Sequence, residues 1–335
     1  MEYKREVFNS FSARVLTKGR KRIVMKVGID LGGSHIAIGV VDSKGKIVEK
    51  IEKRITSIEK KEIKNSIETY IIENSKQMMK RYKVTGVGIA IPGTLSNDRI
   101  IKSVNLGIKE EYDLVKQLKK YIKVPIKIKN DAKCAALAED KKGCLKGFNR
   151  SVFLTLGTGI GGAVIINGKL LDTGDLPGCE FGHMIIEKDG RICNCGNRGC
   201  FEAYSSMKVL KNNIRKELGL DESTRGEELL AMIRKNKKGN NNYEKIEKPI
   251  EDFIEYLSIG ISNLVNIFEP EAIGIGGSFV FFDDVLLNRL KENIIKKDLL
   301  FNPRKELIIT PAVLRNDAGI IGSTLIWQIK KKVLK

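Results

Sequence analysis

The segments Val27-Gly28-Ile29-Asp30-Leu31-Gly32-Gly33 and Leu154-Thr155-Leu156-Gly157-Thr158-Gly159-Ile160-Gly161-Gly162 decide the fold. In each, an apolar strand runs into a glycine-rich turn, and a second strand and a hairpin signal follow, at Ser43-Lys44-Gly45 and at Asn167-Gly168. The two copies are about 125 residues apart, which is too long for a solenoid period. The repeat therefore predicts two related α/β lobes, each of which presents a β-hairpin to a shared cleft.

Length and composition exclude several classes of protein. The chain has 335 residues, more than one compact core usually holds, and 42% of them are apolar. No window approaches the roughly 18–20 apolar residues of a membrane span, and the first twenty residues contain no apolar block typical of a secretory signal. Three of the six cysteines fall within residues 193–200, so no disulfide framework covers the chain. We expect a cytoplasmic protein.

The net charge of +19 has two interpretations. One is a partner with negative charge, either nucleic acid or an anionic membrane surface. The other is a solvated, Lys-rich surface. Lys exceeds Arg, stands beside Glu in helical stretches such as Ile58-Glu59-Lys60-Lys61-Glu62, and is not interleaved with aromatic residues. We therefore expect neither a nucleic-acid partner nor a membrane partner.

Apolar periodicity predicts the remaining elements. A buried strand is expected at 84–91, ended by Pro92-Gly93, and a second strand is expected at 271–275. Beyond residue 205 the chain is expected to be mostly helical. The predicted helices cover residues 57–82, 112–122, 131–140, 251–268 and 317–331.

The paired glycine turns carry the first chemical hypothesis. A phosphate needs backbone N–H donors at close range, and glycine lets the backbone approach it. Asp30 precedes the first turn and suits a hydrated Mg²⁺, while Thr158 adds a hydroxyl to the second. Two ordinary hairpins are the alternative, but their matching strand contexts favour phosphate binding. Neither turn is a P-loop, and neither opens directly into a helix, which disfavours a dinucleotide fold.

Asn130-Asp131 follows a short strand and begins a helix. By itself this pair is most simply an N-cap. A carboxylate between two lobes is also suited to accept a proton from a substrate hydroxyl.

A cluster of potential metal ligands is the third signal. Three thiolates and one imidazole complete a tetrahedral structural zinc site, and the alternative is a set of free buried thiols. The other cysteines, Cys134, Cys144 and Cys179, are expected in the core. The ligands of the predicted zinc site are His183, Cys193, Cys195 and Cys200.

Glu180 and Glu202 flank this loop and put further polar groups beside it. They are either surface carboxylates or part of a site. The context Gly-Cys-Glu-Phe-Gly-His argues against a surface position for Glu180.

Taken together, these motifs resemble the ROK family (repressors, open reading frames and sugar kinases) of the sugar-kinase/Hsp70/actin superfamily. The resemblance runs from about residue 25 to the end of the chain. It departs from the family pattern at Ser34-His35, where Thr-Lys is more usual, and at Gly276-Gly277-Ser278, where a triple glycine is commoner. The segments that carry it are 28–34, Pro92-Gly93, 104–107, 130–132, 155–162, 180–183, 193–202 and 274–277.

For the fold, the resemblance implies a two-lobed, actin-like ATPase (ribonuclease H-like) α/β architecture with an interlobe active-site cleft. Residues 1–24 would be an N-terminal extension. Residues 25–131 would form the N-terminal lobe, completed by a C-terminal helix at 318–335. Residues 132–317 would form the larger C-terminal lobe, with the zinc-binding loop at 183–200.

For the chemistry, the resemblance implies transfer of the γ-phosphate of ATP to a hexose hydroxyl, commonly the 6-hydroxyl, with Mg²⁺ and a structural Zn²⁺. Asp131 matches the family's general base. Sugar contacts match Asn105, Asn130, Asp131, Glu180, His183 and Glu202, with His183 facing the sugar through the ring nitrogen that does not bind zinc. Nucleotide and phosphate contacts match Asp30, Gly32, Gly33, Ser34, Gly157, Thr158, Gly159, Gly161, Gly276 and Gly277.

Glucose is the expected substrate, because residues 104–107 and the Cys-Asn-Cys-Gly loop resemble bacterial glucokinases of the family. Kinases of N-acetylmannosamine, N-acetylglucosamine, fructose and allose share most of these motifs and remain alternatives. The family also contains sugar-responsive repressors with an N-terminal DNA-binding domain. Only 24 residues precede the first strand and Asp131 is present, so we expect a kinase, assembled as a homodimer or homotetramer.

Overall fold

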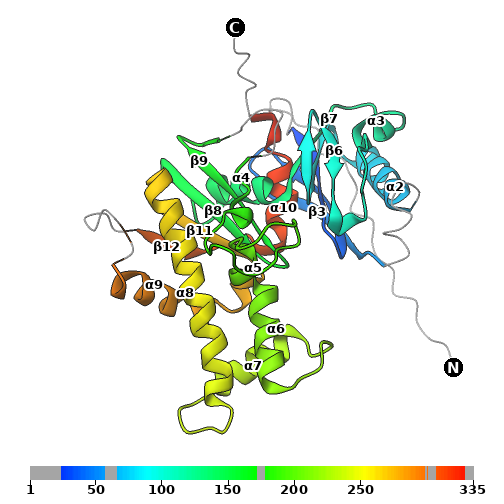
Figure 1. Ribbon diagram of the computed structural model, residues 1–335. Coiled ribbons are helices and arrows are strands. Elements are labelled where there is room, and N and C mark those ends of the chain that lie inside the picture. The colour runs from blue at the N-terminus through cyan, green and yellow to red at the C-terminus, as the bar shows by residue number, and fades with distance from the viewer. Residues whose placement is uncertain (1–23, 57–65, 172–177, 299, 301–306, 329–335) are drawn as a thin grey trace, which may run out of the picture.

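The computed structural model describes residues 24–56, 66–171, 178–298, 300 and 307–328. Two five-stranded sheets organise these residues, and Figure 1 shows them side by side. The first sheet contains β1 (Met25–Leu31), β2 (His35–Asp42), β3 (Ile47–Arg54), β4 (Val84–Ile91) and β7 (Ile126–Asn130). The second sheet contains β8 (Arg150–Leu156), β9 (Ile160–Ile166), β10 (Lys169–Leu170), β11 (Ala272–Gly277) and β12 (Ile308–Pro311).

The two sheets have the same topology. Their strand orders are β3-β2-β1-β4-β7 and β10-β9-β8-β11-β12. In each, an antiparallel meander of three strands is followed by two strands parallel to the first strand of the lobe. The repeat predicted from the two glycine-turn segments is therefore confirmed.

The first sheet is surrounded by fewer helices than the second sheet in the described part of the chain. Ile71 and Met78 of α2 are buried, in a core cluster with Ile89 of the sheet. Of the helix predicted at 57–82, the part from Ser66 is confirmed, and 57–65 lie outside the described residues. The other elements are α2 (Ser66–Arg81), β5 (Thr94–Ser96), β6 (Arg99–Lys102), a 3₁₀ helix (Val104–Leu106) and α3 (Leu114–Lys119).

The second sheet is accompanied by a larger helical region, seen below it in Figure 1. None of the helices in the described ranges is both long and apolar enough to cross a membrane. The elements are a 3₁₀ helix (Phe181–His183), α5 (Glu202–Ser205), α6 (Met207–Leu218), α7 (Gly226–Lys235), α8 (Tyr243–Phe268), a 3₁₀ helix (Ser278–Phe281) and α9 (Asp283–Lys296).

The long helix α8 begins earlier than predicted. It starts at Tyr243 rather than Glu251 and contains Pro249. Pro removes one backbone donor from a helix interior. Here the buried side chains of Ile246, Ile250 and Phe253 continue one apolar stripe across the proline, and their burial keeps this segment helical.

One helix joins the two sheets. α4 (Asp131–Lys142) has Asn130 as its N-cap, as predicted. Its Cys134 lies in a small core cluster with Ala90 of β4, whereas its Leu137 belongs to a cluster with Phe153 of β8. One helix therefore packs against both sheets.

α10 (Ala318–Ser323) packs against β1, β4 and α4 so closely that backbone atoms are in contact. A Cβ at Gly28 would overlap the carbonyl oxygen of Ile320, and a Cβ at Gly88 would overlap that of Ser323. A Cβ at Gly322 would overlap the carbonyl oxygen of Cys134. The Lys26 ammonium also donates to the carbonyl oxygen of Thr324 at 3.2 Å, across 298 positions of sequence. Residues 318–324 are thus packed against the first strand.

The predicted C-terminal helix is shorter than the expected 317–331 or 318–335. α10 ends at Ser323, a 3₁₀ helix spans Ile326–Gln328, and residues 329–335 lie outside the described part of the chain. The hydroxyls of Ser323 and Thr324 donate to the carbonyl oxygens of Ile320 and Ile321 at 2.8 and 2.7 Å. Such local bonds compete with the α-helical ladder.

A buried carboxylate fixes the segment that leads into α10. Glu139 of α4 has 0% of its surface exposed. One carboxylate oxygen accepts from the backbone N–H of Cys144 at 2.8 Å, and the other accepts from that of Leu314 at 2.8 Å. Glu139 therefore ties the end of α4 to the chain just before α10.

Gly88→Ala is expected to destabilise the protein by about 1–3 kcal/mol or more, because the added methyl group has no room between β4 and the backbone of α10. Gly226→Ala at the start of α7 is the matched control, since its Cβ would lie 3.5 Å from the Lys211 side chain. Urea unfolding measures both. Equal unfolding free energies for the two variants would contradict the close packing at Gly88.

Candidate functional site

The predicted polar residues gather where parallel strands end. Asp30 is opposite Ala90 in the first sheet, and Ile91 is opposite Asn130. Asp30, the Pro92-Gly93 turn and Asn130 therefore lie at one edge of that sheet. In α/β proteins, ligands bind beyond this carboxyl edge.

The second sheet repeats this arrangement. Leu156 of β8 is paired with Gly277 of β11, so the turn at 157–159 and Gly276-Gly277 lie at the same edge. Gly277 has φ +72°, and a Cβ there would overlap the backbone of Leu156. The two strands therefore end so close together that position 277 requires glycine, which has no side chain.

Asn130 carries two hydrogen bonds that orient the start of α4. Its side-chain oxygen accepts from the N–H of Lys133 at 3.2 Å, and its amide nitrogen donates to the carbonyl oxygen of Gly93 at 3.2 Å. The N-cap interpretation is confirmed, and the cap also connects α4 to the turn after β4.

Asp131 follows directly, and its carboxylate is electrostatically coupled to two others. One oxygen accepts from the N–H of Ala132 at 2.8 Å. Burial, followed by the charge of Glu180, raises the pKa of Asp131, while that hydrogen bond opposes the shift. The site thus makes Asp131 a better proton acceptor than an ordinary aspartate.

Asp30 also lies in an environment that is unfavourable for charge. Burial and the charge of Asp131 raise the pKa of Asp30 to about 7, and the Lys50 ammonium opposes this shift. A Cβ at Gly319 of α10 would overlap the Asp30 carboxyl group. The sequence alone did not assign Gly319 and Lys50 to the site, because the contacts join distant parts of the chain.

The first glycine turn is closed on itself and lies against a predicted sugar contact. Gly32 donates its N–H to the carbonyl oxygen of His35 at 2.9 Å. A Cβ at Gly33 would lie 3.2 Å from the Cβ of Asn105, which is exposed. Ser34 is also exposed. The structure brings Asn105 to this turn.

The second glycine turn forms hydrogen bonds with residues that follow it much later in the chain. Gly157 donates to the carbonyl oxygen of Gly159 at 2.9 Å and accepts from the N–H of Lys208 at 3.1 Å. A carboxylate oxygen of Glu202 accepts from the N–H of Ile160 at 2.8 Å. Among the described residues, no atom lies within 4 Å of a Cβ built on Gly157. Open space therefore adjoins this turn, and the hydroxyl-bearing Thr158 is exposed there.

Gly161 connects this turn to the start of α4. A Cβ on Gly161 would lie 3.0 Å from the Cβ of Ala132, the residue after Asp131. The start of α4 thus packs against the strand that follows the second glycine turn.

The four predicted metal ligands converge. One ligand atom of each residue lies within 4.8 Å of every other. The Cys193 Sγ is 3.8 Å from the His183 Nδ1, and the Cys195 Sγ is 3.6 Å from the Cys200 Sγ. A tetrahedral Zn²⁺ with bonds of about 2.3 Å separates its sulfur ligands by about 3.8 Å. The donor set therefore fits zinc, with the Nε2 of His183 left for another partner.

Two expectations around this cluster are corrected. Glu180 is exposed rather than sheltered, because it immediately precedes a 3₁₀ helix whose Phe181 and Gly182 take the buried positions. Of the cysteines expected in the core, Cys134 is buried, but Cys144 and Cys179 are only partly buried.

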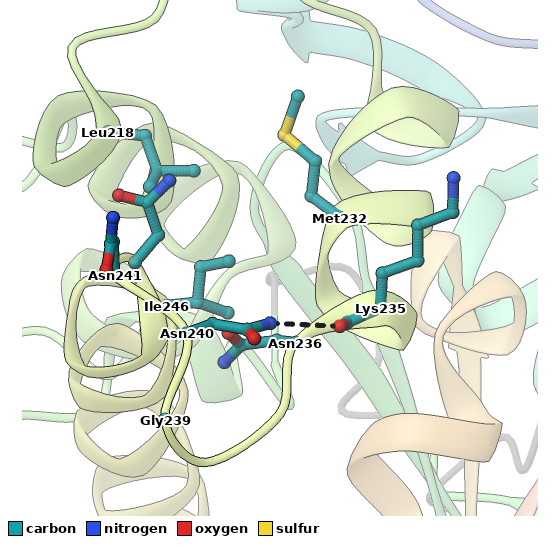
Figure 2. A pocket seen from close by; sticks show the side chains of 9 residues that line it. Leu218, Met232, Lys235, Asn236, Gly239, Asn240, Asn241 and Ile246 are labelled. Carbon is teal, nitrogen blue, oxygen red and sulfur yellow. Dashed lines mark hydrogen bonds between the residues drawn. The ribbon is translucent and has the colours of Figure 1, made fainter.

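A pocket elsewhere in the described residues contains none of these groups. It lies among α6, α7, α8 and the Asn-rich loop before α8, where the Asn240 amide donates to the carbonyl oxygen of Lys235 at 3.3 Å (Figure 2). Apolar side chains there, such as Leu218 and Ile246, close the end of the helical region.

The repeated sheets, the helix that joins them and the paired glycine turns define a two-lobed protein of the actin-like ATPase fold. A solved structure supports this: a ROK family glucokinase from Streptomyces griseus in complex with glucose and AMPPNP superposes with a TM-score of 0.75 at 24% identity, covering 91% of this chain and 99% of that chain. The ROK family model matches residues 26–330. This chain belongs to the ROK family.

Curated relatives include both kinases and repressors. The chain is 31% identical to a glucokinase from Thermotoga maritima over 92% of its own length and 98% of the relative. It is 28% identical to a xylose repressor from Bacillus spizizenii over 82% of its own length and 69% of the relative.

Asp30→Asn is expected to change the pH dependence of stability. The folded chain holds the Asp30 proton up to about pH 7, whereas the unfolded chain releases it near pH 3.8. The stability associated with this proton is therefore complete below pH 3.8 and is lost as the pH rises to about 7. Relative to wild type, the variant should gain about 3–4 kcal/mol between pH 4 and pH 8.

Urea unfolding at a series of pH values measures this difference. Asp98→Asn, in an exposed turn, is the control and should follow the wild-type pH profile. An Asp30→Asn profile parallel to wild type would show that Asp30 is ionised in the folded protein.

Proposed function

We propose that this protein is an ATP-dependent sugar kinase that transfers the γ-phosphate of ATP to the 6-hydroxyl of a hexose. The observation that carries the proposal is the position of Asp131. Its carboxylate is coupled to Asp30 and Glu180, and the next residue, Ala132, packs against Gly161 after the second glycine turn. A base beside backbone phosphate donors is the arrangement that phosphoryl transfer to a hydroxyl requires.

In this mechanism Asp131 accepts the proton of the attacking hydroxyl as the bond to phosphorus forms. The pKa of Asp131 is raised, and its carboxylate is therefore a stronger base than that of an exposed aspartate. The N–H groups of the glycine turns that are not already bonded within the protein bind the phosphates. Most of the catalysis then comes from positioning and charge stabilisation.

Asp30 would hold hydrated Mg²⁺, which neutralises phosphate charge when bound. The first turn contributes Gly32, Gly33 and Ser34. The second turn contributes Gly157, Thr158, Gly159 and Gly161. Gly276 and Gly277 would contact the nucleoside side of ATP. The neighbour that holds AMPPNP, an analogue of ATP, supports this choice of phosphate donor.

The sugar would be held by side chains from both lobes, namely Asn105 and Asn130 from the first and Glu180, His183 and Glu202 from the second. His183 is suited to this role, because zinc on its Nδ1 leaves the Nε2 free to face a hydroxyl. We propose zinc as the metal of the Cys/His cluster and a structural role for it, since all four ligands are protein groups.

Glucose is the proposed substrate. The similarity to the Thermotoga glucokinase over nearly the whole of both chains supports it. The similarity to a xylose repressor supports a second candidate function, that of a sugar-responsive regulator without catalytic activity. Asp131 favours the kinase, because a regulator that only binds sugar has no need of a base coupled to two further carboxylates.

Asp131→Asn is expected to lower kcat by about 10²–10⁴-fold, because the general base is removed while the shape of the side chain is kept. The affinity for sugar should change much less. A coupled ADP-release assay measures kcat, and calorimetry measures sugar binding. Asp252→Asn, on the exposed side of α8, is the control. Near wild-type turnover of Asp131→Asn would refute the assignment of the base.

The purified protein is expected to contain about one zinc per chain, measured by elemental analysis without chelators. Cys195→Ser should lose the metal and reduce activity, because the loop that carries His183 and leads to Glu202 loosens. Cys144→Ser, outside the cluster, should retain both. Full activity of a metal-free preparation would be incompatible with a structural zinc.

Glucose is expected to have the highest kcat/KM in a panel of hexoses and N-acetylhexosamines, with the product phosphorylated at the 6-hydroxyl. A site built to hydrogen-bond free hydroxyls discriminates against analogues that leave its groups unpaired. A tenfold or greater preference for N-acetylmannosamine, N-acetylglucosamine, fructose or allose would replace glucose as substrate. Sugar binding without ADP release from any member of the panel would favour the regulator.

A further inference from the structure

Glu202 is expected to contact the sugar, yet one of its carboxylate oxygens is already engaged with the protein. The Oε2 accepts from the N–H of Ile160 at 2.8 Å, and Ile160 is the residue where the second glycine turn becomes β9. A Cβ at Gly159 would overlap this carboxylate. The missing side chain at Gly159 is therefore what lets the carboxylate reach the turn.

The other end of the same turn is held by the same segment of chain. The carbonyl oxygen of Gly157 accepts from the N–H of Lys208 at 3.1 Å. Between its two ends the turn has an internal bond from the Gly157 N–H to the Gly159 carbonyl oxygen at 2.9 Å. Residues 202–208, which comprise α5 and the start of α6, thus form hydrogen bonds with both ends of the turn.

This segment begins directly after the metal-ligand cluster. Cys200 accepts from the N–H of Ala203 at 2.9 Å through its carbonyl oxygen, and Phe201 donates its N–H to the carbonyl oxygen of Met184 at 2.8 Å. The loop that carries His183 and the first turn of α5 are therefore joined by backbone bonds. The position of Glu202 depends on the loop that carries the predicted sugar contacts.

We propose that Glu202 is a positioning residue for the phosphate-binding turn, and that it links the sugar side of the site to the nucleotide side. The inference rests on the proposed function, since it takes the turn to bind ATP. By occupying the Ile160 N–H, the carboxylate fixes the direction of the turn, which borders the open space beside Gly157. A residue that only contacted sugar would leave nucleotide binding unchanged.

The test compares two neutral variants, so that the change in charge near the phosphates cancels. The side-chain oxygen of Gln in Glu202→Gln accepts from the Ile160 N–H, whereas Glu202→Ala has no acceptor. In the absence of sugar, Glu202→Ala should bind MgATP about tenfold more weakly than Glu202→Gln, as measured by calorimetry. Equal affinities of the two variants would overturn the proposal.

Hydrogen exchange of the Ile160 amide gives a readout that needs no nucleotide. It should be about tenfold faster in Glu202→Ala than in Glu202→Gln, because the amide loses its acceptor. Glu180→Ala removes the other proposed sugar-binding glutamate and should leave this exchange as in wild type. Equal exchange in the two Glu202 variants would overturn the positioning role.

The two measurements separate this inference from the proposed function. If the wild-type protein binds no MgATP but the exchange difference is present, the kinase proposal fails and Glu202 still positions the turn. If MgATP binds equally well to all variants, the kinase proposal stands and the role of Glu202 is refuted.

Discussion

The close approach of α10 to its neighbours is the constraint on which the rest of the structure depends. A helix backbone contacts β1 and β4 on one side and α4 on another, and each contact is possible only because a glycine removes a side chain. Gly28, Gly88 and Gly322 therefore set the distance between the first sheet and the helix that begins with Asp131. Protein interiors are packed too densely to absorb an added methyl group at such places.

The same contact shapes the electrostatics of the cleft. Gly319 of α10 lies against the Asp30 carboxyl group, and burial is the main cause of the raised pKa of Asp30. Asp131, on the neighbouring helix, adds its charge. Two acidic groups on different elements are thereby kept close together, in a site where bound Mg²⁺ and phosphate would rearrange both charges.

Local chemistry made much of this fold and site predictable from the sequence. The strand-and-glycine pattern around Asp30 and Thr158 recurs at both sheet edges, and the Asn130 cap and the Cys/His cluster form as their spacing indicated. What escaped prediction depends on long-range packing. The burial of Ile246 and Ile250 carries α8 through Pro249, and the hydroxyl of Ser323 ends α10 early. The hold of Glu202 on Ile160 spans 42 positions, and no local pattern announces it.

The bond between Lys26 and Thr324 has a consequence for how the chain is made. These residues are 298 positions apart, yet the first sheet is complete only when α10 covers β1 and β4. At a synthesis rate of about 5–20 residues per second, β1 waits about 15–60 s on the ribosome for its cover. The second sheet needs no such late arrival for its β8–β9 hairpin. The first sheet is therefore covered only after α10 has been made, although its own strands are synthesised first.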